Sequence, residues 1–322
     1  MLRDKKFIVV EGWQSNAMAA YLIKRLVQSI FVLFGITVVV FVVLHLSGDP
    51  VQLMVPPSAS QADIEALRAK MGFNDPIYQQ YLRFLTDILH GNFGESYYYN
   101  EPAMKIVLER FPATVELSLC AMIIALLVSI PAGIISAVKR NSMSDGIIRL
   151  FALLGQCVPS FWLGILLILL FSVNLHILPT GGNKEASSII LPAITLGTFS
   201  AASITRVLRS SMIEVLGKEF ITVAIAKGLP YRMVIMKHAF KNAFSGMMTI
   251  IGMQFAGLLG GSVIIETVFA WPGVGRLIVQ SITNNDFMVV EATVILLASI
   301  FVLINFIVDV LYCVINPRVK MQ

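Results

Sequence analysis

The sequence predicts an all-α integral membrane protein with about six transmembrane helices. Of its 322 residues, 57% are hydrophobic and 13% are charged, whereas a soluble domain carries about 25% charged residues. Several apolar runs reach the roughly 20 residues that a helix needs to cross a hydrocarbon core about 30 Å thick. The net charge of +5 comes from lysines and arginines at the edges of these runs, which is typical of orientation signals rather than of a nucleic-acid-binding surface.

Six apolar runs account for the predicted spans. They cover residues 26–46, 117–138, 147–173, 189–207, 247–269 and 289–315. Pro159 interrupts the third run, and neighbouring helices can satisfy the backbone group that such a proline leaves unpaired. The fourth run is only weakly apolar, but it is rich in Ala, Ser and Thr, the residue types that let helices pack closely inside a membrane.

The distribution of basic residues predicts that both termini face the cytosol. Loops on the cytoplasmic side of a membrane carry an excess of Lys and Arg. Such residues precede the first span, separate the second from the third and the fourth from the fifth, and follow the sixth, whereas the opposite short loops hold only Lys184 and Arg276. The basic residues on the predicted cytosolic side include Lys24, Arg25, Lys139, Arg140, Arg149, Arg206, Arg209, Arg318 and Lys320.

A long segment of mixed charge follows the first span and is predicted to lie outside the cell. Its residues 62–70 predict an amphipathic helix that ends near Gly72, and several aromatic residues follow. Two compatible interpretations remain open: a covering subdomain at the level of the lipid headgroups, where Tyr is enriched, or a platform for an extracytoplasmic protein. The predicted organisation is a cytosolic segment 1–25, a first span 26–46, an extracytoplasmic segment 47–115, a core 116–315 with spans two to six, and a cytosolic tail 316–322.

Residues 213–243, between the fourth and fifth spans, form a basic and amphipathic cytosolic loop. A short helix is expected there, ended by Gly228 and Pro230, because Gly adopts the left-handed turn after a helix and Pro cannot continue one. Glu219 lies in its first turn, where the helix dipole favours a negative charge. One interpretation is a hairpin on lipid headgroups; the other is a helix that docks into a groove of a partner protein. The apolar residues available for docking are Phe220, Ile221, Val223, Ala224 and Ile225.

The residues of this loop resemble the EAA coupling loop of ABC importer permeases, with Glu219, Ala224, Ala226 and Gly228 at the matching positions. The longer pattern, with Lys227–Leu229 and then Lys237–Ala239 and Lys241–Ala243, resembles the dipeptide/oligopeptide/nickel branch of that family. Further family-like motifs, from Met18 onwards, are GDP at 48–50, MGFNDPIYQQY at 71–81, GNFGES at 91–96, FPATVEL at 111–117, PSFWLG at 159–164, LPA at 191–193, ETVFAWPGVGR at 266–276 and NPR at 316–318.

The resemblance implies the permease subunit of an ATP-driven importer in the bacterial inner membrane, working by alternating access. The implied partners are two ATP-binding subunits or domains, a homologous second permease, an extracytoplasmic substrate-binding protein and membrane lipid, with no nucleic acid. Thr222 and Ile225 stand where related loops often carry Arg, which favours a more apolar contact. The residues expected to contact the ATPase are Glu219, Phe220, Ala224, Ala226, Lys227 and Gly228.

No nucleotide site is expected in this chain. Gly217–Lys218 is followed by Glu219 rather than by Ser or Thr, and the upstream glycine spacing of a Walker A loop is missing. We therefore expect the chain to be no enzyme and to hold no cofactor, with ATP and Mg bound by partner subunits. The four histidines are scattered and show no i, i+4 pair, so no metal site is predicted.

Small and polar residues in the last two spans are candidates for a translocation path. They are Gln254, Gly257, Gly261, Ser262 and Asn305. Small residues serve close helix packing equally well, whereas an amide inside a span is a functional candidate. We expect Asp309 to reach water or a basic residue near the cytosolic end, and Glu116 and Glu266 to be interfacial. The three cysteines are expected to be small buried hydrophobes.

The cargo and some rival functions remain open at this point. Peptides are favoured by the breadth of the family, and a nickel or metallophore importer permease of the same family is the alternative. A secondary transporter is a distant alternative, because it would predict inverted repeats and charged residues at the midplane. An intramembrane protease would need HExxH, GxSxG or paired aspartates, and a passive channel would need no docking loop.

Overall fold

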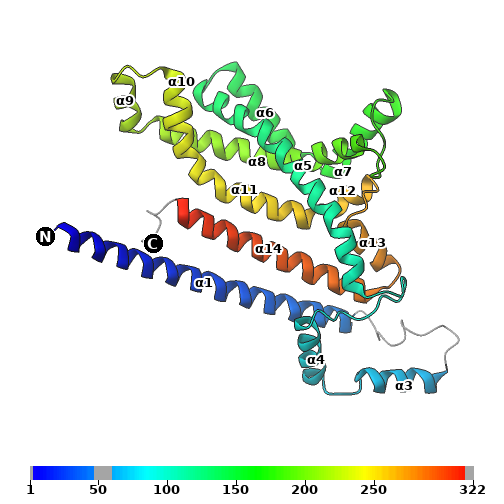
Figure 1. The fold of residues 1–322 in the computed structure, drawn as a ribbon. Coiled ribbons are helices and arrows are strands. Elements are labelled where there is room, and N and C mark those ends of the chain that lie inside the picture. Colours follow the sequence, from blue (N-terminus) through cyan, green and yellow to red (C-terminus); the bar gives the residue numbers. More distant parts are fainter. Residues whose placement is uncertain (1–2, 47–59, 316–322) are drawn as a thin grey trace.

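The computed structural model describes residues 3–46 and 60–315, and this part of the chain is all-α, without a strand (Figure 1). The expected tail 316–322 and the GDP and NPR motifs lie outside the described residues. In chain order the helices are α1 Arg3–Leu46, α3 Gln61–Met71, α4 Ile77–Leu89, α5 Ala103–Val138, α6 Met143–Cys157, α7 Ser160–Leu167, η1 Ile168–Asn174, η2 Ala186–Ile189, α8 Ile190–Leu216, α9 Glu219–Ala226, α10 Tyr231–Met233, η3 Val234–Phe240, α11 Lys241–Gly261, α12 Val263–Val268, α13 Val274–Thr283 and α14 Phe287–Ile315.

The described helices confirm the predicted membrane fold. Four of them are long and apolar enough to cross a membrane, within α1, α5, η2 with α8, and α14, and the number rises to six if each of two bent helix pairs forms one span. Two boundaries differ from the prediction. Helix α5 already begins at Ala103, and α8 continues to Leu216, so Arg206 and Arg209 lie on a helix rather than in a loop.

The third predicted span is two helices rather than one interrupted helix. Helix α6 and the continuous helical stretch 160–174 are bent by 104° against each other. Val158 takes an extended conformation before Pro159, because the ring of a proline excludes the helical conformation of the residue before it. Cys157 is exposed at this bend, so the expectation of a buried cysteine is wrong there. A second bend, of 56°, separates residues 231–244 from residues 246–260.

Helices α5 and α8 form the most extensive contact of the fold. Both helices present a buried small residue at every fourth position, which lets two backbones approach closely. A Cβ atom on Gly197 would lie only 2.6 Å from the carbonyl oxygen of Ala121, so this crossing needs glycine. The two stripes are Ala121, Ala125, Ser129, Gly133 and Ala137 on α5, and Ala193, Gly197, Ala201 and Thr205 on α8.

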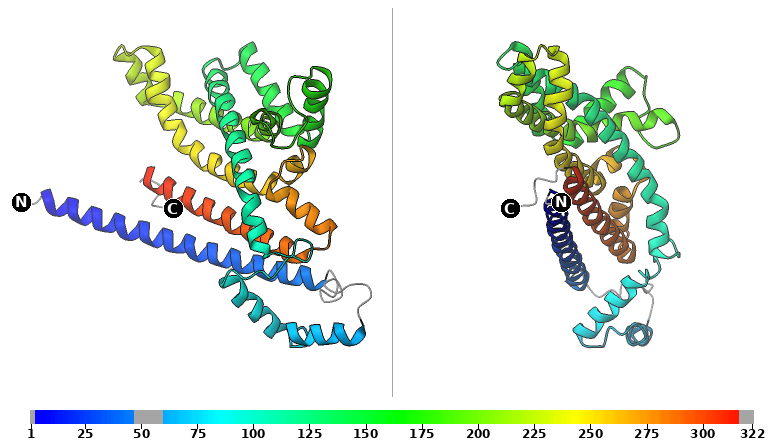
Figure 2. Two further views of the ribbon diagram at one scale, coloured as in Figure 1. Left: turned by 45° about the vertical axis from the view of Figure 1, so that its right-hand side comes forward. Right: turned by 60° about the vertical axis from the view of Figure 1, so that its left-hand side comes forward.

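Helix α1 lies beside α14 at the edge of the bundle (Figure 2). Arg25 on α1 pairs with Asp309 on α14, with 3.3 Å between Nε and Oδ2. This contact confirms the expectation that Asp309 reaches a basic residue. The pair is partly exposed, so its contribution to stability is modest.

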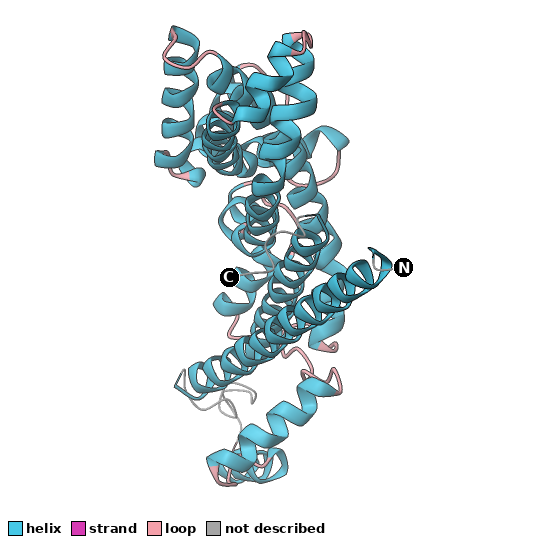
Figure 3. Cartoon of the chain, turned by 90° about the vertical axis from the view of Figure 1, so that its left-hand side faces the viewer, coloured by secondary structure: helices cyan, strands magenta, loops and turns pink. Residues whose placement is uncertain are grey.

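The segment after α1 forms a small helical cover at one end of the molecule. Helix α3 includes all residues of the predicted amphipathic helix, 62–70. Gly72 follows α3 and has a φ of +71°. Helix α4 packs on α1, where the Tyr81 hydroxyl lies 2.9 Å from the Thr37 hydroxyl and the Phe41 ring stacks on Phe84. Helices α3 and α4 lie at the lower end in Figure 3, far from α9 at the upper end.

Candidate coupling site and transport face

Helix α9 is a short, sharply ended helix at the end of the molecule opposite α3 and α4 (Figure 1). The N–H of Gly228 donates to the Ile225 carbonyl at 2.9 Å, and the N–H of Leu229 donates to the Ala224 carbonyl at 3.4 Å. Gly228 has a φ of +74°. These two bonds and the left-handed glycine make a Schellman motif, which satisfies the carbonyl groups at the end of a helix. The predicted helix and its glycine stop are therefore confirmed.

One face of α9 packs on the chain itself. Ile221 and Ala224 are 3% and 6% exposed. The prediction that both could enter a groove of a partner protein is therefore wrong, because both are buried. Both belong to the main hydrophobic core, and α9 packs on η3. The same core also contains Met212 and Val215 of α8 and Val234 and Ala239 of η3.

The other face of α9 is apolar and uncovered. Phe220, Val223 and Ile225 are 41%, 52% and 50% exposed. Glu219, Ala226, Lys227 and Gly228 are exposed beside them. Lys218, just before the helix, pairs with Glu214 at 2.9 Å. This arrangement leaves a compact apolar surface on the side of α9 opposite its buried face. Glu219, Lys218 and Lys227 border that surface.

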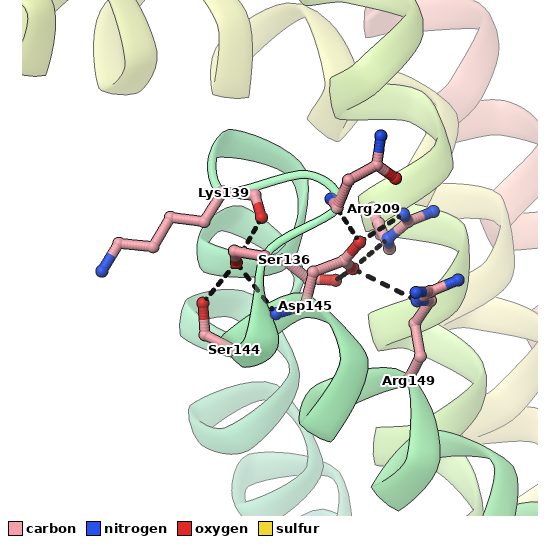
Figure 4. A network of polar contacts seen from close by, with 8 residues as sticks. Ser136, Lys139, Ser144, Asp145, Arg149 and Arg209 are labelled. Atoms are coloured by element: carbon pink, nitrogen blue, oxygen red, sulfur yellow. Dashed lines mark hydrogen bonds and ion pairs between the residues drawn. The ribbon is translucent and has the colours of Figure 1, made fainter.

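A buried carboxylate lies close to the same end of the molecule, where α5, α6 and α8 meet (Figure 4). The Asp145 side chain is fully buried and receives a bidentate pair of bonds from Arg209 on α8, Nε to Oδ1 at 2.8 Å and Nη2 to Oδ2 at 2.9 Å. It also accepts from the Ser136 hydroxyl at 2.6 Å and from the Asn141 N–H at 3.0 Å. Arg209 was predicted only as an orientation signal, and its pairing with Asp145 was not predicted from the sequence.

Two local signals point to this pair. Ser142 caps α6 and accepts from the Asp145 N–H at 3.3 Å, as expected for a serine at the N-cap of a helix. Arg209 follows Thr205 at the four-residue spacing of the small-residue stripe on α8. An arginine at that spacing is directed toward α5 and its neighbours, and so it needs a buried acidic partner.

A second buried carboxylate, Glu266, lies at the opposite end of the core. It is 0% exposed, so other parts of the protein cover it, and its expected position at the membrane interface stays a prediction. One carboxylate oxygen accepts from the hydroxyls of Ser262, at 2.7 Å, and Thr114, at 2.8 Å. The other accepts from the Arg276 N–H at 3.0 Å. We call Thr114, Ser262, Glu266 and Arg276 the Glu266 cluster.

The Glu266 cluster caps α13 from outside that helix. Gly273 precedes α13 and offers no side chain to its free N–H groups. The Glu266 carboxylate accepts a hydrogen bond from the backbone N–H of the third helical residue, Arg276. The Thr114 hydroxyl accepts from the N–H of the first, Val274, at 2.9 Å. A Cβ atom on Gly273 would lie 2.4 Å from the Glu266 carboxylate, so this close approach needs glycine. A carboxylate at a helix N-terminus is also favoured by the dipole.

The motifs that carry the family resemblance meet at this end of the molecule. Trp271 is 2% exposed, and its ring N–H donates to the Ala113 carbonyl at 2.8 Å. Ser96, from the GNFGES motif, donates to the buried carboxylate of Asp286 at the turn before α14. Segments far apart in the sequence are thereby bound to one another around the starts of α5, α13 and α14.

The predicted path residues occupy different environments. Gly257 lies on an exposed stripe of α11, whereas Gln254 is half-buried. Ser262 is 1% exposed and belongs to the Glu266 cluster. The Asn305 amide donates back to the Phe301 carbonyl at 2.8 Å. The backbone of Gly261 ends α11. Their role in transport stays a prediction.

The described residues hold no group of three or more His, Cys, Asp or Glu side chains that could bind a metal ion. The buried carboxylates of Asp145 and Glu266 serve instead in an ion pair and in a helix cap. The arrangement as a whole is a helical bundle with an exposed apolar surface at one end and a closely bonded helical junction at the other.

Comparison with known proteins agrees with this arrangement. Residues 129–321 match the family "Binding-protein-dependent transport system inner membrane component", and residues 18–118 match "Binding-prot-dependent transport system membrane comp, N-term". The chain is 39% identical to the oligopeptide transport system permease protein AppB of Bacillus subtilis strain 168 over 94% of this chain and 100% of that protein. It is 40% identical to the glutathione transport system permease protein GsiC of Escherichia coli strain K12, over 94% of this chain and 99% of that protein.

A solved structure shares the fold of about two thirds of the chain. A chain of the MetNI methionine ABC transporter in an inward-facing conformation superposes with a TM-score of 0.58 at 18% identity, covering 66% of this chain and 97% of that chain. The protein described here therefore belongs to the family of binding-protein-dependent transport system inner membrane components and is a permease subunit of an ABC importer.

Proposed function

We propose that this chain is the gate of an importer that takes peptides or peptide-like molecules from an extracytoplasmic binding protein and releases them into the cytosol. Cytosolic ATP-binding subunits supply the energy by docking on α9. The chain hydrolyses no ATP and holds no cofactor of its own. Alternating access arises when two such subunits close and move α9, which shifts the bundle between two packed states.

The observation that carries this proposal is the two-sided packing of α9. Ile221 and Ala224 fix the helix to the core, while Phe220, Val223 and Ile225 remain uncovered. An apolar helix face of this kind is suited to a groove in a partner protein. A hairpin resting on lipid could use the same face, but the chain has no Walker A loop and an ATP-driven importer needs a contact with its motor. We therefore assign the face to an ATP-binding subunit.

The charges around α9 support a cytosolic position for that end. Lys218, Lys227, Arg232 and Lys237 are exposed in this region, as expected for the cytoplasmic side of a membrane protein. Both termini and the loop 213–243 then face the cytosol, and α3 and α4 cover the outer end. Their exposed surfaces form a platform for the extracytoplasmic binding protein, and the Glu266 cluster lies beneath that platform.

The transport path requires a second, homologous permease. Met253 and Ile264 are 54% and 53% exposed, and Gly257 and Gly260 lie with them on one uncovered stripe that runs from α11 into α12. Such a stripe of one chain can face the same stripe of another and leave room between them. Gln254 and Asn305 are the polar candidates beside that space, because amides within a membrane span are functional candidates.

The names of the relatives favour a peptide cargo. One is a permease for oligopeptides and the other for glutathione, which is itself a small peptide. Nickel or metallophore complexes are the second candidate that the sequence resemblance raised, and neither of these relatives supports it. The apolar lining expected for the path gives no charge signature of its own.

Purification and reconstitution test this function together. We expect the tagged permease to copurify with an ATP-binding subunit and a second permease. In proteoliposomes containing these subunits and the binding protein, ATP is supplied on the side of the membrane that α9 faces. Labelled peptide should accumulate on that side only when ATP is present there. Uptake driven by a proton or sodium gradient without ATP would contradict the proposal and favour a secondary transporter. Uptake of nickel chelate instead of peptide would correct the cargo alone.

A further inference from the structure

We propose that Asp145 is a positioning residue for transport. Its buried ion pair with Arg209 ties α6 to the helix that carries α9, so that a displacement of α9 moves α6 with it. This inference rests on the proposed docking of an ATP-binding subunit on α9. We call the pair of Asp145 and Arg209 the α6–α8 tie.

The tie joins several elements at one point. The Asp145 carboxylate, at the start of α6, accepts from Ser136 near the end of α5, from the backbone of the turn between α5 and α6, and from Arg209 on α8. Arg149, one turn further along α6, lies 3.5 Å away. A bidentate Arg–carboxylate contact fixes relative orientation as well as distance. The tie therefore sets the angle between the axes of α6 and α8.

Apolar packing between α6 and α8 is incomplete beside the tie. A cavity of ≈ 400 Å³ opens between α5, α6 and α8, and its lining includes Ile148, Ala152 and Thr205. Gly155 and Ala202 line the same cavity, and the two helices approach closely there, because a Cβ atom on Gly155 would lie 3.0 Å from the Ala202 methyl carbon. Helix α6 is therefore held on α8 by the tie near its start and by the Gly155 contact near its end, with the cavity alongside. Without the tie, its first turns would be free to swing about the Gly155 contact.

The tie lies on a continuous helical connection to α9. Helix α8 runs unbroken through Arg209 to Leu216, so the arginine is about two turns from the end of the helix. Only Gly217 and Lys218 separate that end from α9. The N–H of Lys218 donates to the Val215 carbonyl at 3.0 Å, and the Lys218 ammonium pairs with Glu214 at 2.9 Å, so a movement of α9 carries the end of α8, and Arg209 with it.

Helix α6 leads onwards to the opposite end of the core. It continues through the bend at Pro159 into α7, where Gly164 lies against the Phe269 ring; a Cβ atom on this glycine would lie 3.0 Å from the ring. Phe269 directly follows α12, which carries Glu266. The tie thus completes a chain of contacts from the docking surface, through α8, α6 and α7, to the Glu266 cluster. Since spatial continuity alone does not establish coupling, the test measures coupling directly.

The test compares a neutral tie with a neutral control pair. Asp145→Asn/Arg209→Gln removes both charges but keeps groups that can hydrogen-bond, which avoids the unpaired buried charge of a single substitution. The matched control, Arg25→Gln/Asp309→Asn, neutralises the ion pair between α1 and α14, outside this chain of contacts. Both are purified as the complete transporter, and peptide taken up per ATP hydrolysed is measured in proteoliposomes, together with the amount of copurifying ATP-binding subunit.

We expect the double variant at the tie to keep its ATP-binding subunit and its ATPase activity, while peptide uptake per ATP falls at least about fivefold, the lower end of typical coupling between sites. The control pair should leave this ratio unchanged. An unchanged ratio in the tie variant, or loss of the ATP-binding subunit from it, would overturn the proposal. Failure of wild-type protein to bind the subunit would instead refute the docking of α9 itself.

Arg209→Lys provides a second variant in case the double variant does not fold. Lysine keeps the charge opposite Asp145 but acts as a point charge and cannot form the two-pronged contact. We expect a folded protein with normal ATPase activity and a reduced ratio of uptake to hydrolysis. A wild-type ratio in this variant would show that charge alone suffices and that the geometry of the tie has no role in positioning.

Discussion

Replacing Gly228 by valine is expected to abolish peptide uptake, whereas asparagine at the same position should preserve most of it. Gly228 has a φ of +74°, and a Cβ atom there would meet no atom within 4 Å. Neither substitution therefore creates a steric clash at Cβ, and the expected difference comes from backbone preference. Asn tolerates the left-handed region, but a β-branched residue does not, and forcing it there costs about 1–3 kcal/mol. The end of α9 would then unwind and displace the docking surface.

The measurement is ATP-dependent uptake in proteoliposomes, with membrane insertion checked by fluorescence of a tagged protein. We expect uptake to fall by more than about tenfold in Gly228→Val, because strain above about 1.4 kcal/mol shifts an equilibrium by that factor. Gly228→Pro should act in the same way, since its ring fixes φ near −65°. Equal uptake by the valine and asparagine variants would show that the Schellman turn has no part in docking.

Charge reversal at Glu219 is a related change on the same helix. Lysine would place a positive charge at the N-terminus of α9, where the dipole disfavours it. We expect Glu219→Lys to lose uptake while its insertion into the membrane remains normal. We therefore expect its effect on docking to resemble that of Gly228→Val. Glu214→Lys, which makes the same change of charge one turn before α9, serves as the comparison.

Replacing Glu266 by alanine is expected to destabilise the permease strongly, and replacing it by glutamine only weakly. Alanine would leave three donors without an acceptor, the hydroxyls of Thr114 and Ser262 and the Arg276 N–H. A buried unsatisfied donor costs about 1–3 kcal/mol. Glutamine can present its carbonyl oxygen to the Arg276 N–H and donate to the two hydroxyl oxygens, because hydroxyls both donate and accept.

Thermal unfolding of the purified permease in detergent tests this ranking. Glu266→Ala should unfold at a clearly lower temperature than wild type, with Glu266→Gln close to wild type. Glu116→Ala is the matched control, since Glu116 is exposed on α5 and surface substitutions usually change stability by about 0.5 kcal/mol or less. Equal melting temperatures for all three variants would contradict the assignment of Glu266 as the buried cap of α13.

Local sequence rules predicted the helices and the end of α9 well. Apolar run length predicted α1, α5, α8 and α14, and the amphipathic pattern predicted α3. The glycine and proline after residue 226 predicted the stop of α9, because the conformational limits of these two residue types do not depend on distant contacts. Which face of α9 is covered depends on tertiary contacts such as those with η3, so the prediction that Ile221 and Ala224 are free to dock was wrong.

The two buried carboxylates were beyond such rules. Glu266 stands at the edge of an apolar run, and its burial depends on Thr114, which lies far earlier in the chain. Arg209 reads as a cytosolic charge because hydropathy registers a charge but not its partner, and Asp145 is contributed by another helix. Pro159 was correctly predicted to interrupt the third span, but the 104° bend there was not predicted, because it depends on the packing of α7 on α8 and α12.

The most direct test of the docking role is a photoreactive amino acid placed at Val223, which is 52% exposed on α9. Irradiation of living cells should crosslink this position to an ATP-binding subunit. The same probe at Ile221, which is 3% exposed on the opposite face, should give a crosslink only within the chain. A crosslink from Val223 to an extracytoplasmic protein, or labelling of this position by a reagent that cannot cross the membrane, would contradict the account.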